Sequence, residues 1–276
     1  MKENYSVLMS VYRNEKPSIL EQSMQSIYDQ TVPTDDFVLI CDGPLTKRLD
    51  DVISEMKKKF GKRLNVIKHD ENHGLGYCLR AGIPECKNDL IARMDSDDIS
   101  RKDRCEKELE IFTKNPKVSV VGGLVGEFAV TIDEVKSIRK VPEANEEIIK
   151  FVKWRSPMNH PSVMFRKKDI LAVGNYPEVR KCQDWYLWTN LLMNGYQLYN
   201  IQDILVYMRE DKTTFKRRSG WQYFKIQKQL YNNMRKKNFI SIPQYAAAVS
   251  VRFCSAMAPN SIRQALFKKF MREKVK

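Results

Sequence analysis

The sequence lacks a long hydrophobic run. It has 276 residues, 42% hydrophobic and 30% charged, which is typical of a globular protein. A membrane-spanning helix needs about 18–20 consecutive apolar residues, and the best candidate, 245–258, is shorter and contains Arg252. The first residues enter a strand-like pattern without the hydrophobic region of a signal peptide. We therefore expect a cytoplasmic protein that does not span a membrane.

Several common site motifs are also missing. The six cysteines form no C-x-x-C pair and no metal-ligand spacing, so reduced, mostly buried thiols are expected. Histidine is scarce, with three in the chain. Neither a G-x-G-x-x-G motif nor a G-x-x-x-x-G-K-[ST] loop is present, which excludes the dinucleotide and P-loop types of nucleotide site.

Acidic residues are nearly absent from the last quarter of the chain. Residues 212–276 contain 16 Lys and Arg but one acid, Glu273, whereas residues 1–211 contain 32 basic and 33 acidic residues. The net charge of +14 therefore belongs to the C-terminal segment. We expect a nearly neutral body over 1–211 and a basic, helical extension over 212–276.

The first hundred residues alternate between strand-like and helix-like patterns. Apolar runs of strand length lie at 5–11, 37–41, 64–69 and 89–94. Helical spacing follows Pro17 and covers 49–60 and 74–83. Further along, 118–130 looks like a strand with a Gly-Gly break, and 146–154 looks like a short helix. Strands separated by helices predict an α/β fold, a mostly parallel sheet with helices on both faces. In such sheets ligands bind at the carboxyl ends of the strands.

Carboxylates cluster after the fourth predicted strand, as Asp95-Ser96-Asp97-Asp98. Carboxylates two residues apart on an extended chain can reach one hard cation. A bound cation would neutralise a diphosphate leaving group as its charge develops. A turn followed by a helix cap near Ser100 is the alternative. Three acids within four residues favour the cation, because their mutual repulsion otherwise has no compensation.

Two other strand ends carry polar candidates. Asp42 could accept a hydrogen bond from a nucleobase imide or could merely form the turn before Pro44. Asn72 and Gly74 precede the third helix, where glycine lets the backbone approach a ligand. Arg80 could reach a phosphate or a carboxylate, or lie on a solvated helix face.

Two candidates lie in the second half of the body. His160, in a polar loop, suits a metal or phosphate role or a structural hydrogen bond. Asp184 begins an aromatic, apolar helical stretch. It could be a general base whose apolar surroundings tune its pKa, or an acid that stabilises a helix N-terminus.

The ordered set of these motifs resembles glycosyltransferase family 2, and more narrowly the bacterial enzymes that build O-antigen, capsule and exopolysaccharide repeat units. The matching motifs are S-V-L-M-S-V-Y-R-N-E near the start, Asp42-Gly43, Asn72-x-Gly74-Leu75, Asp95-Ser96-Asp97-Asp98, and His160-Pro161-Ser162 before Gln183-Asp184-Trp185. The resemblance covers about 5–210. It implies a GT-A (Rossmann-like) catalytic domain over 1–211, with a nucleotide-binding half at about 1–100 and an acceptor half at about 101–211. It also implies a nucleotide-diphosphate sugar donor, Mn²⁺ or Mg²⁺, and inversion at the anomeric carbon.

The resemblance also implies roles for individual residues. The nucleotide-sugar set is Val11, Tyr12, Arg13, Glu15, Asp42, Asn72, Gly74, Arg80, Arg93, Asp95 and Ser96. Asp97 would ligate the metal, with Asp95 at the metal or its water shell and His160 as a further candidate ligand. Asp184 matches the acid of the family's Glu-Asp pair and would deprotonate the acceptor, although Gln183 replaces the preceding Glu. The Q-x-x-R-W motif of processive synthases is absent, which favours addition of one sugar.

The implied substrates are UDP-glucose or UDP-galactose as donor and a lipid-diphosphate-linked sugar, N-acetylglucosamine, as acceptor. Such an acceptor places the enzyme on the cytoplasmic face of the inner membrane. In the extension, apolar residues recur at helical spacing opposite basic ones, which suits an anionic membrane surface or a helix packed on the body. The apolar residues are Tyr223, Ile226, Leu230, Tyr231 and Met234, and the basic ones Lys225, Lys228, Arg235 and Lys236. The oligomeric state stays open.

Two other classes of protein compete with this interpretation. A nucleic-acid-binding protein would explain the charge of +14, but unneutralised N-terminal acids would repel phosphates, so we expect no nucleic-acid partner. A sugar-nucleotide pyrophosphorylase would need a glycine-rich, basic phosphate loop after the first strand. Tyr12-Arg13-Asn14-Glu15 does not supply one.

Overall fold

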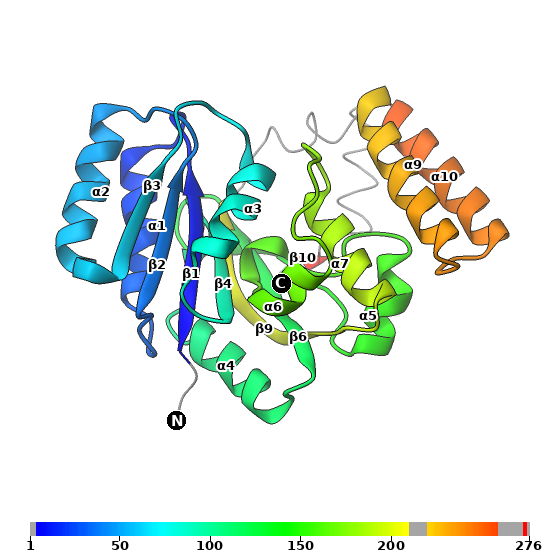
Figure 1. Cartoon of the computed structure of the whole chain (residues 1–276), viewed down its shortest axis with the longest axis horizontal. Coiled ribbons are helices and arrows are strands. Elements are labelled where there is room, and N and C mark those ends of the chain that lie inside the picture. The colour runs from blue at the N-terminus through cyan, green and yellow to red at the C-terminus, as the bar shows by residue number, and fades with distance from the viewer. Residues whose placement is uncertain (1–3, 210–219, 259–272, 275–276) are drawn as a thin grey trace.

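The computed structural model describes residues 4–209, 220–258 and the pair Glu273–Lys274. One half of its sheet is parallel (Figure 1). This half contains β1 (Tyr5–Val11), β2 (Asp36–Cys41), β3 (Leu64–Lys68) and β4 (Leu90–Asp95), in the order β3-β2-β1-β4. All four strands agree with the sequence prediction to within a residue. Because they are parallel, their carboxyl ends share one edge of the sheet.

The other half of the sheet is mixed. It contains β5 (Ile99–Ser100), β6 (Val118–Phe128), β7 (Val135–Arg139), β8 (Met164–Arg166), β9 (Gln197–Arg209) and β10 (Glu273–Lys274). β8 joins the halves by pairing antiparallel with both β4 and β6, and β9 runs parallel to β6. The short β5 pairs with β9 beside the end of β4.

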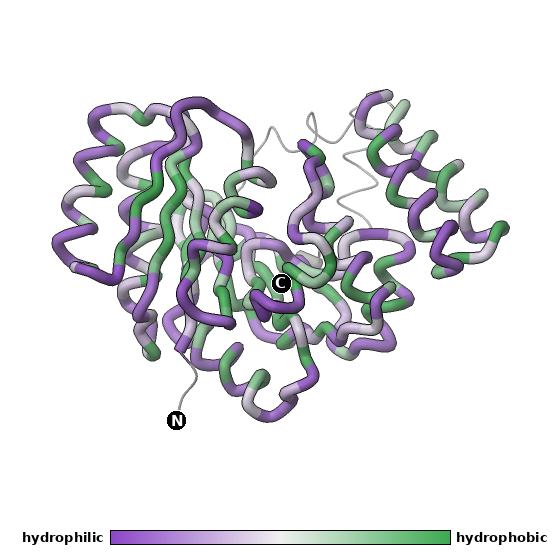
Figure 2. The backbone as a smooth tube through the Cα atoms, viewed as in Figure 1, coloured by the Kyte–Doolittle hydropathy of each residue, from purple (hydrophilic) through white to green (hydrophobic). Residues whose placement is uncertain are grey.

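Helices cover both faces of the sheet, as predicted. The helices of the body are α1 (Pro17–Tyr28), α2 (Lys47–Phe60), α3 (Leu75–Glu85), α4 (Arg104–Lys114), α5 (Asn145–Val152), α6 (Lys167–Ala172) and α7 (Gln183–Met193). Alternate residues of β1 point to opposite faces: Val7 and Met9 pack with α1, α2 and α4, and Leu8 packs with α3, α5 and α7. Figure 2 shows α2 alternating between hydrophilic and hydrophobic residues, as expected for a helix buried along one side.

Two expectations for the middle of the chain are wrong. No helix begins near Ser100; the chain instead pairs with β9, and α4 begins at Arg104. β6 is continuous through Gly122 and Gly123 rather than broken. A Cβ on Gly123 would lie 2.5 Å from the Leu205 side chain, so these glycines make room for β9.

The extension forms a helical hairpin of α9 (Trp221–Lys236) and α10 (Ile242–Met257), packed side by side (Figure 1). The apolar side of α9, for which a membrane and the body were the two alternatives, packs on the body: Leu230, Tyr231 and Met234 join the core with α7, and Ile226 is partly buried against it. The extension is also not wholly helical, because β10 pairs with β7. The predicted boundary at 211–212 lies outside the described residues, as do 212–219 and 259–272.

Buried and exposed ion pairs on α4 provide a matched test of the fold. Arg104 and Glu108 are both fully buried, and Arg104 also donates to the carbonyl oxygen of Arg93 (2.8 Å) on β4. Burial raises the pKa of Glu108 to about 7 despite Arg104. Arg104→Met should therefore lower the free energy of unfolding by about 3–5 kcal/mol, because it leaves an unpaired buried acid.

The exposed pair of Lys114 and Glu110, at the same spacing on α4, is the control. Lys114→Met should change the free energy of unfolding by less than about 1 kcal/mol. Urea unfolding of both variants measures the difference. Equal decreases in the free energy of unfolding would contradict the larger contribution expected of the buried pair.

Candidate active site

Three carboxylates converge where β4 ends. Asp95 is the last residue of β4, and Asp97 and Asp98 follow in the turn to β5. One oxygen from each lies within 4.8 Å of the others. Like charges this close repel strongly, so the cluster requires compensating positive charge.

Arg93 supplies one buried positive charge to this cluster. Its guanidinium is fully buried and binds both oxygens of Asp95, with Nη1 at 2.6 Å from Oδ2. The two residues are separated by one position on β4, so their side chains lie on the same face. Burial would lower the pKa of Arg93, but Asp95, Tyr176 and Asp98 together outweigh it and raise that pKa, so the guanidinium stays charged.

The other two carboxylates form no ion pair among the described residues, and Arg93 offsets their charge only in part. Desolvation, then the charges of Asp95 and Glu15, raise the pKa of Asp97 to about 7. Burial and its two acidic neighbours raise the pKa of Asp98 well above its usual value. Asp98 accepts a hydrogen bond from the Arg209 N–H (3.3 Å), while its buried Oδ2 has no partner among the described residues. A set of oxygen donors with excess negative charge fits a hard divalent cation such as Mn²⁺ or Mg²⁺.

The loop after β1 meets this cluster. Glu15 accepts a hydrogen bond from the Ser96 hydroxyl (3.1 Å), which joins the ends of β1 and β4. Val11 is buried, and its carbonyl oxygen accepts the N–H of Asp42 (2.8 Å) at the end of β2. Tyr12 and Arg13 are exposed between them. These predicted nucleotide-sugar residues therefore lie along one edge of the sheet.

Asp42 organises the loop before α3. Its carboxylate accepts hydrogen bonds from the Asn72 side chain (2.8 Å) and from the N–H groups of His73 (2.7 Å) and Gly74 (3.0 Å). Gly74 precedes α3 with φ of 91°, a conformation that side chains disfavour. The structure thus brings together Asp42, Asn72 and Gly74 as one unit.

Arg80 lies further along α3 and contacts the chain before α7. Its Nη1 donates to the carbonyl oxygens of Gly174 (3.0 Å) and Tyr176 (2.8 Å), and its Nε lies 3.8 Å from Glu178. These contacts fix the 174–178 segment against α3. Any contact of Arg80 with a nucleotide remains a prediction.

Asp184 begins α7 and faces the end of α5. Its Oδ2 accepts a hydrogen bond from the Ser156 hydroxyl (3.1 Å). The next residue, Trp185, donates its indole N–H to the carbonyl oxygen of Val152 (2.8 Å), which fixes the start of α7 relative to α5. Cys182, the residue before α7, has the left-handed conformation, at φ of 60°.

Tyr176 is buried, and its electrostatic neighbours include both Asp184 and Asp95. Its pKa is raised by burial, lowered in part by Arg93, and raised again by Asp184 and Asp95, so all three charges are close to it. Its hydroxyl is 2.7 Å from Nε2 of His160. Burial, then Arg93, lower the pKa of His160, so that ring is neutral. His160 is thus paired with Tyr176, and the clustered oxygens come from the three aspartates.

Sequence reasoning did not single out three residues of this region. Asp98 carried a signal, as the third acid in its motif, but no role was given to it. Tyr176 and Ser156 carried none, because only the fold brings them to His160 and Asp184.

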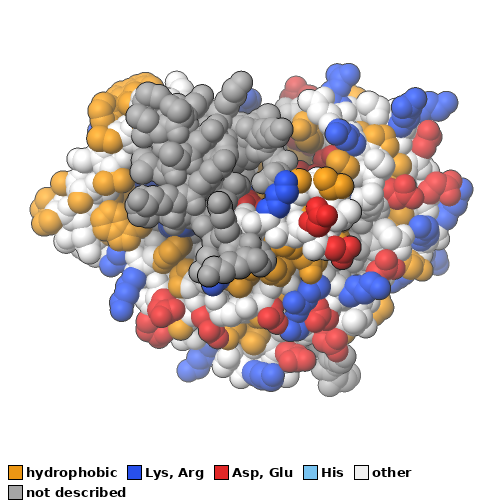
Figure 3. Space-filling model, turned by 180° about the vertical axis from the view of Figure 1, so that it is seen from behind, with side chains coloured by type: hydrophobic (Ala, Val, Ile, Leu, Met, Phe, Trp, Pro, Cys, Tyr) orange, Lys and Arg blue, Asp and Glu red, His pale blue; other side chains and the backbone are white. Residues whose placement is uncertain are grey.

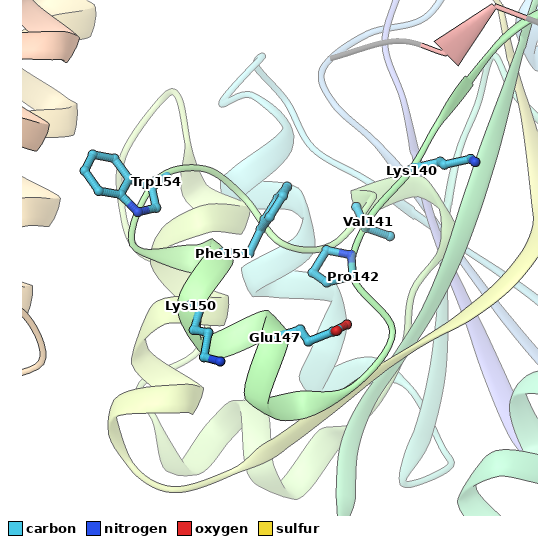
Figure 4. Close-up of a pocket in the computed structure, with 7 residues that line it drawn as sticks. All are labelled: Lys140, Val141, Pro142, Glu147, Lys150, Phe151 and Trp154. Atoms are coloured by element: carbon cyan, nitrogen blue, oxygen red, sulfur yellow. The ribbon is translucent and has the colours of Figure 1, made fainter. Parts of the chain in front are cut away.

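A separate pocket of about 660 Å³ lies beside α5 (Figure 4). It is lined by Lys140, Val141, Pro142, Glu147, Lys150, Phe151 and Trp154. None of these belongs to the predicted site, so the pocket is distinct from the strand-end cluster.

The sequence matches known proteins along most of its length. The family model for glycosyl transferase family 2 matches residues 6–174. The UDP-Gal:alpha-D-GlcNAc-diphosphoundecaprenol beta-1,3-galactosyltransferase of Escherichia coli is 37% identical over 268 residues, covering 97% of this chain and 96% of that protein. The amylovoran biosynthesis glycosyltransferase AmsE of Erwinia amylovora is 32% identical over 270 residues, covering 96% and 98%.

Solved structures support the fold. Staphylococcus aureus TarS 1-349 in complex with UDP-GlcNAc aligns with a TM-score of 0.64 at 14% identity, covering 97% of this chain and 71% of that one. The mannosyltransferase PcManGT from Pyrobaculum calidifontis, in complex with GDP-Man and Mn²⁺, aligns with a TM-score of 0.63 at 15% identity, covering 98% and 80%. These likenesses confirm the expected GT-A fold.

The family match spans the strand-end cluster, and relatives above 30% identity cover nearly the whole chain. The chain therefore belongs to glycosyltransferase family 2 and is a glycosyltransferase.

Proposed function

We propose that this enzyme transfers one hexose, with inversion, from a UDP-sugar to a lipid-diphosphate-linked N-acetylglucosamine. The observation that carries the proposal is the convergence of Asp95, Asp97 and Asp98 at the end of β4, with a further acid, Asp184, held separately in the first turn of α7. An inverting transfer needs a base for the acceptor and a stabilised leaving group, on opposite faces of the sugar. The two acidic groups supply these functions from separate parts of the fold.

The donor lies along the carboxyl edge of β1, β2 and β4. Asp42, held by the 72–74 loop, accepts a hydrogen bond from the base, and the loop containing Tyr12 and Arg13 covers the nucleotide. Asp97 would hold the divalent ion, with Asp95 and Asp98 as neighbouring oxygen donors. When bound, Mn²⁺ or Mg²⁺ neutralises the charge that develops on the diphosphate.

Asp184 acts on the acceptor. Its carboxylate takes the proton of the acceptor hydroxyl as the new bond to the anomeric carbon forms and the bond to UDP breaks. Ser156 and the Trp185 contact hold Asp184 in place during this step. Arg93 binds both oxygens of Asp95 and so holds this carboxylate in place at the cluster.

The substrates are proposed from the relatives. The Escherichia coli protein is named for UDP-Gal and for a GlcNAc-diphosphoundecaprenol acceptor, and AmsE for amylovoran biosynthesis. UDP-galactose is therefore the first donor to test and UDP-glucose the second, in the synthesis of a bacterial surface polysaccharide. A lipid-linked acceptor requires the enzyme at the cytoplasmic face of the inner membrane as a peripheral protein. Among the described residues, no helix combines the length and apolarity needed to cross a bilayer.

Donor use is tested directly with a lipid-diphosphate-linked N-acetylglucosamine acceptor. UDP-galactose and UDP-glucose are supplied separately, with Mn²⁺, while UDP release and product mass are followed. We expect acceptor-dependent release of UDP with one of them and a product heavier by one hexose. Acceptor-dependent turnover with neither, or a ladder of longer products, would contradict the proposal.

Asp184→Asn tests the base. Transfer should fall by about 10²- to 10⁴-fold, with UDP affinity unchanged, because the amide cannot accept the proton. Asp169→Asn is the matched control, since Asp169 also lies in the first turn of a helix, α6. If Asp184 served only to stabilise a helix terminus, both variants would behave alike and Asp184→Asn would keep its transfer rate.

Asp97→Asn tests the metal site. Calorimetry should show UDP affinity in Mn²⁺ falling by at least about 10-fold, while affinity in EDTA stays that of the wild type. Asp51→Asn, on the exposed side of α2, is the control and should match the wild type in both buffers. If Asp97→Asn bound UDP in Mn²⁺ as tightly as the wild type does, the assignment of Asp97 as a metal ligand would be refuted.

A further inference from the structure

The outer surface of α10 is apolar and exposed. Ile242, Val251, Phe253 and Met257 keep 64%, 55%, 45% and 43% of their surface accessible, and Trp221 at the start of α9 keeps 52%. The described chain has twelve exposed large hydrophobic residues, and these five of them lie within the short segment 220–258. In Figure 3 hydrophobic side chains gather at the edge where α9 and α10 lie. A patch of this kind indicates a docking surface.

Among the described residues of α10, no charged side chain points to this surface. Arg252 is the one charged residue of α10, and it points inward: its guanidinium lies 5.0 Å from the centre of the Trp185 ring and donates to the Tyr231 hydroxyl (3.4 Å). The surface therefore differs from the apolar side of α9, for which the sequence left a membrane as one alternative and which is buried. We call the exposed side chains of Trp221, Ile242, Val251, Phe253 and Met257 the α10 surface.

Basic residues are exposed on the same hairpin. Lys225, Lys228, Lys236 and Lys237 are exposed on α9 and the turn after it, and Lys225 lies 5.8 Å from the centre of the Trp221 ring. The described hairpin has six Lys and Arg and no acid. A second copy of this chain docked there would bring like charges together, whereas anionic lipid headgroups complement them.

Size and side-chain types fit a helix lying along a bilayer. The 16 residues of α10 extend about 24 Å at 1.5 Å per residue, less than the about 30 Å of a hydrocarbon core. The rings of Trp221 and Phe253 meet edge to face, with their centroids 6.4 Å apart, and form an aromatic pair on this surface. Tryptophan is favoured at the depth of lipid headgroups.

We propose that the α10 surface binds the face of an anionic bilayer, with the α9 lysines at the headgroups. The purpose of this contact, which is to meet a lipid-linked acceptor, rests on the proposed function; the contact itself does not. It also connects the bilayer to the base: Trp185, next to Asp184, packs on Tyr231, and the Tyr186 hydroxyl donates to the carbonyl oxygen of Ile226 (2.6 Å). A bound hairpin would therefore fix the position of Asp184 relative to the membrane.

The test is co-sedimentation of the full chain with acceptor-free vesicles of phosphatidylglycerol and phosphatidylcholine. Val251→Asp/Met257→Asp should weaken binding by at least about 10-fold, since it places two charges in the apolar contact. Val130→Asp is the control, because Val130 is 75% exposed but lies on the body; it should bind as the wild type does. Lys225→Gln/Lys228→Gln should lower vesicle affinity about five-fold for each lysine replaced. High salt should lower the affinity of this variant little further.

Two results would overturn the proposal. One is vesicle binding by Val251→Asp/Met257→Asp equal to that of Val130→Asp, with circular dichroism showing all variants folded. The other is a wild-type dimer in sedimentation velocity that this double variant dissociates, without vesicle binding, which would assign the surface to a second copy. Transfer by the wild type to a water-soluble acceptor in a vesicle-free assay reports on the proposed function separately, so either claim can fail alone.

Discussion

Crowding of negative charge at the end of β4 is the constraint on which the site depends. One oxygen each of Asp95, Asp97 and Asp98 lies within 4.8 Å of the others, a spacing at which like charges repel strongly. Among the described residues, the buried guanidinium of Arg93 binds one of these carboxylates, Asp95. Arg93 is in turn held by β4, whose carbonyl oxygen is bound by Arg104 from α4. The fold thus brings the acids together and neutralises only part of their charge, which leaves a site that favours a cation and a diphosphate together.

The donor half of the fold could be predicted because its signals are local. Continuous apolar runs such as that ending at Val11 indicate buried parallel strands, and the polar residue after each strand, such as Asp42 or Asp95, must lie at the carboxyl edge. The acceptor half could not be predicted in the same way, because its contacts join distant segments. Tyr176 reaches His160 and the Asp184 region only through the packing of β8, α6 and α7.

The C-terminal hairpin shows a limit of helical periodicity. The spacing of Leu230, Tyr231 and Met234 correctly indicates an amphipathic α9, but periodicity cannot tell whether an apolar side meets lipid or protein. In the structure that side packs on α7. The surface left exposed belongs to α10, where small and apolar residues without charge give a weak periodic signal. The hairpin therefore buries one apolar side against the helix that carries Asp184 and presents another outward.

The central claim is that the carboxylate cluster is the metal site of the donor complex. Crystals grown with Mn²⁺ and UDP, measured at the manganese absorption edge, test it most directly. The account predicts one strong anomalous peak within coordination distance, about 2.0–2.3 Å, of an Asp97 oxygen and of the UDP diphosphate. A peak on UDP with no carboxylate of the cluster in contact, or a peak elsewhere on the chain, would contradict it.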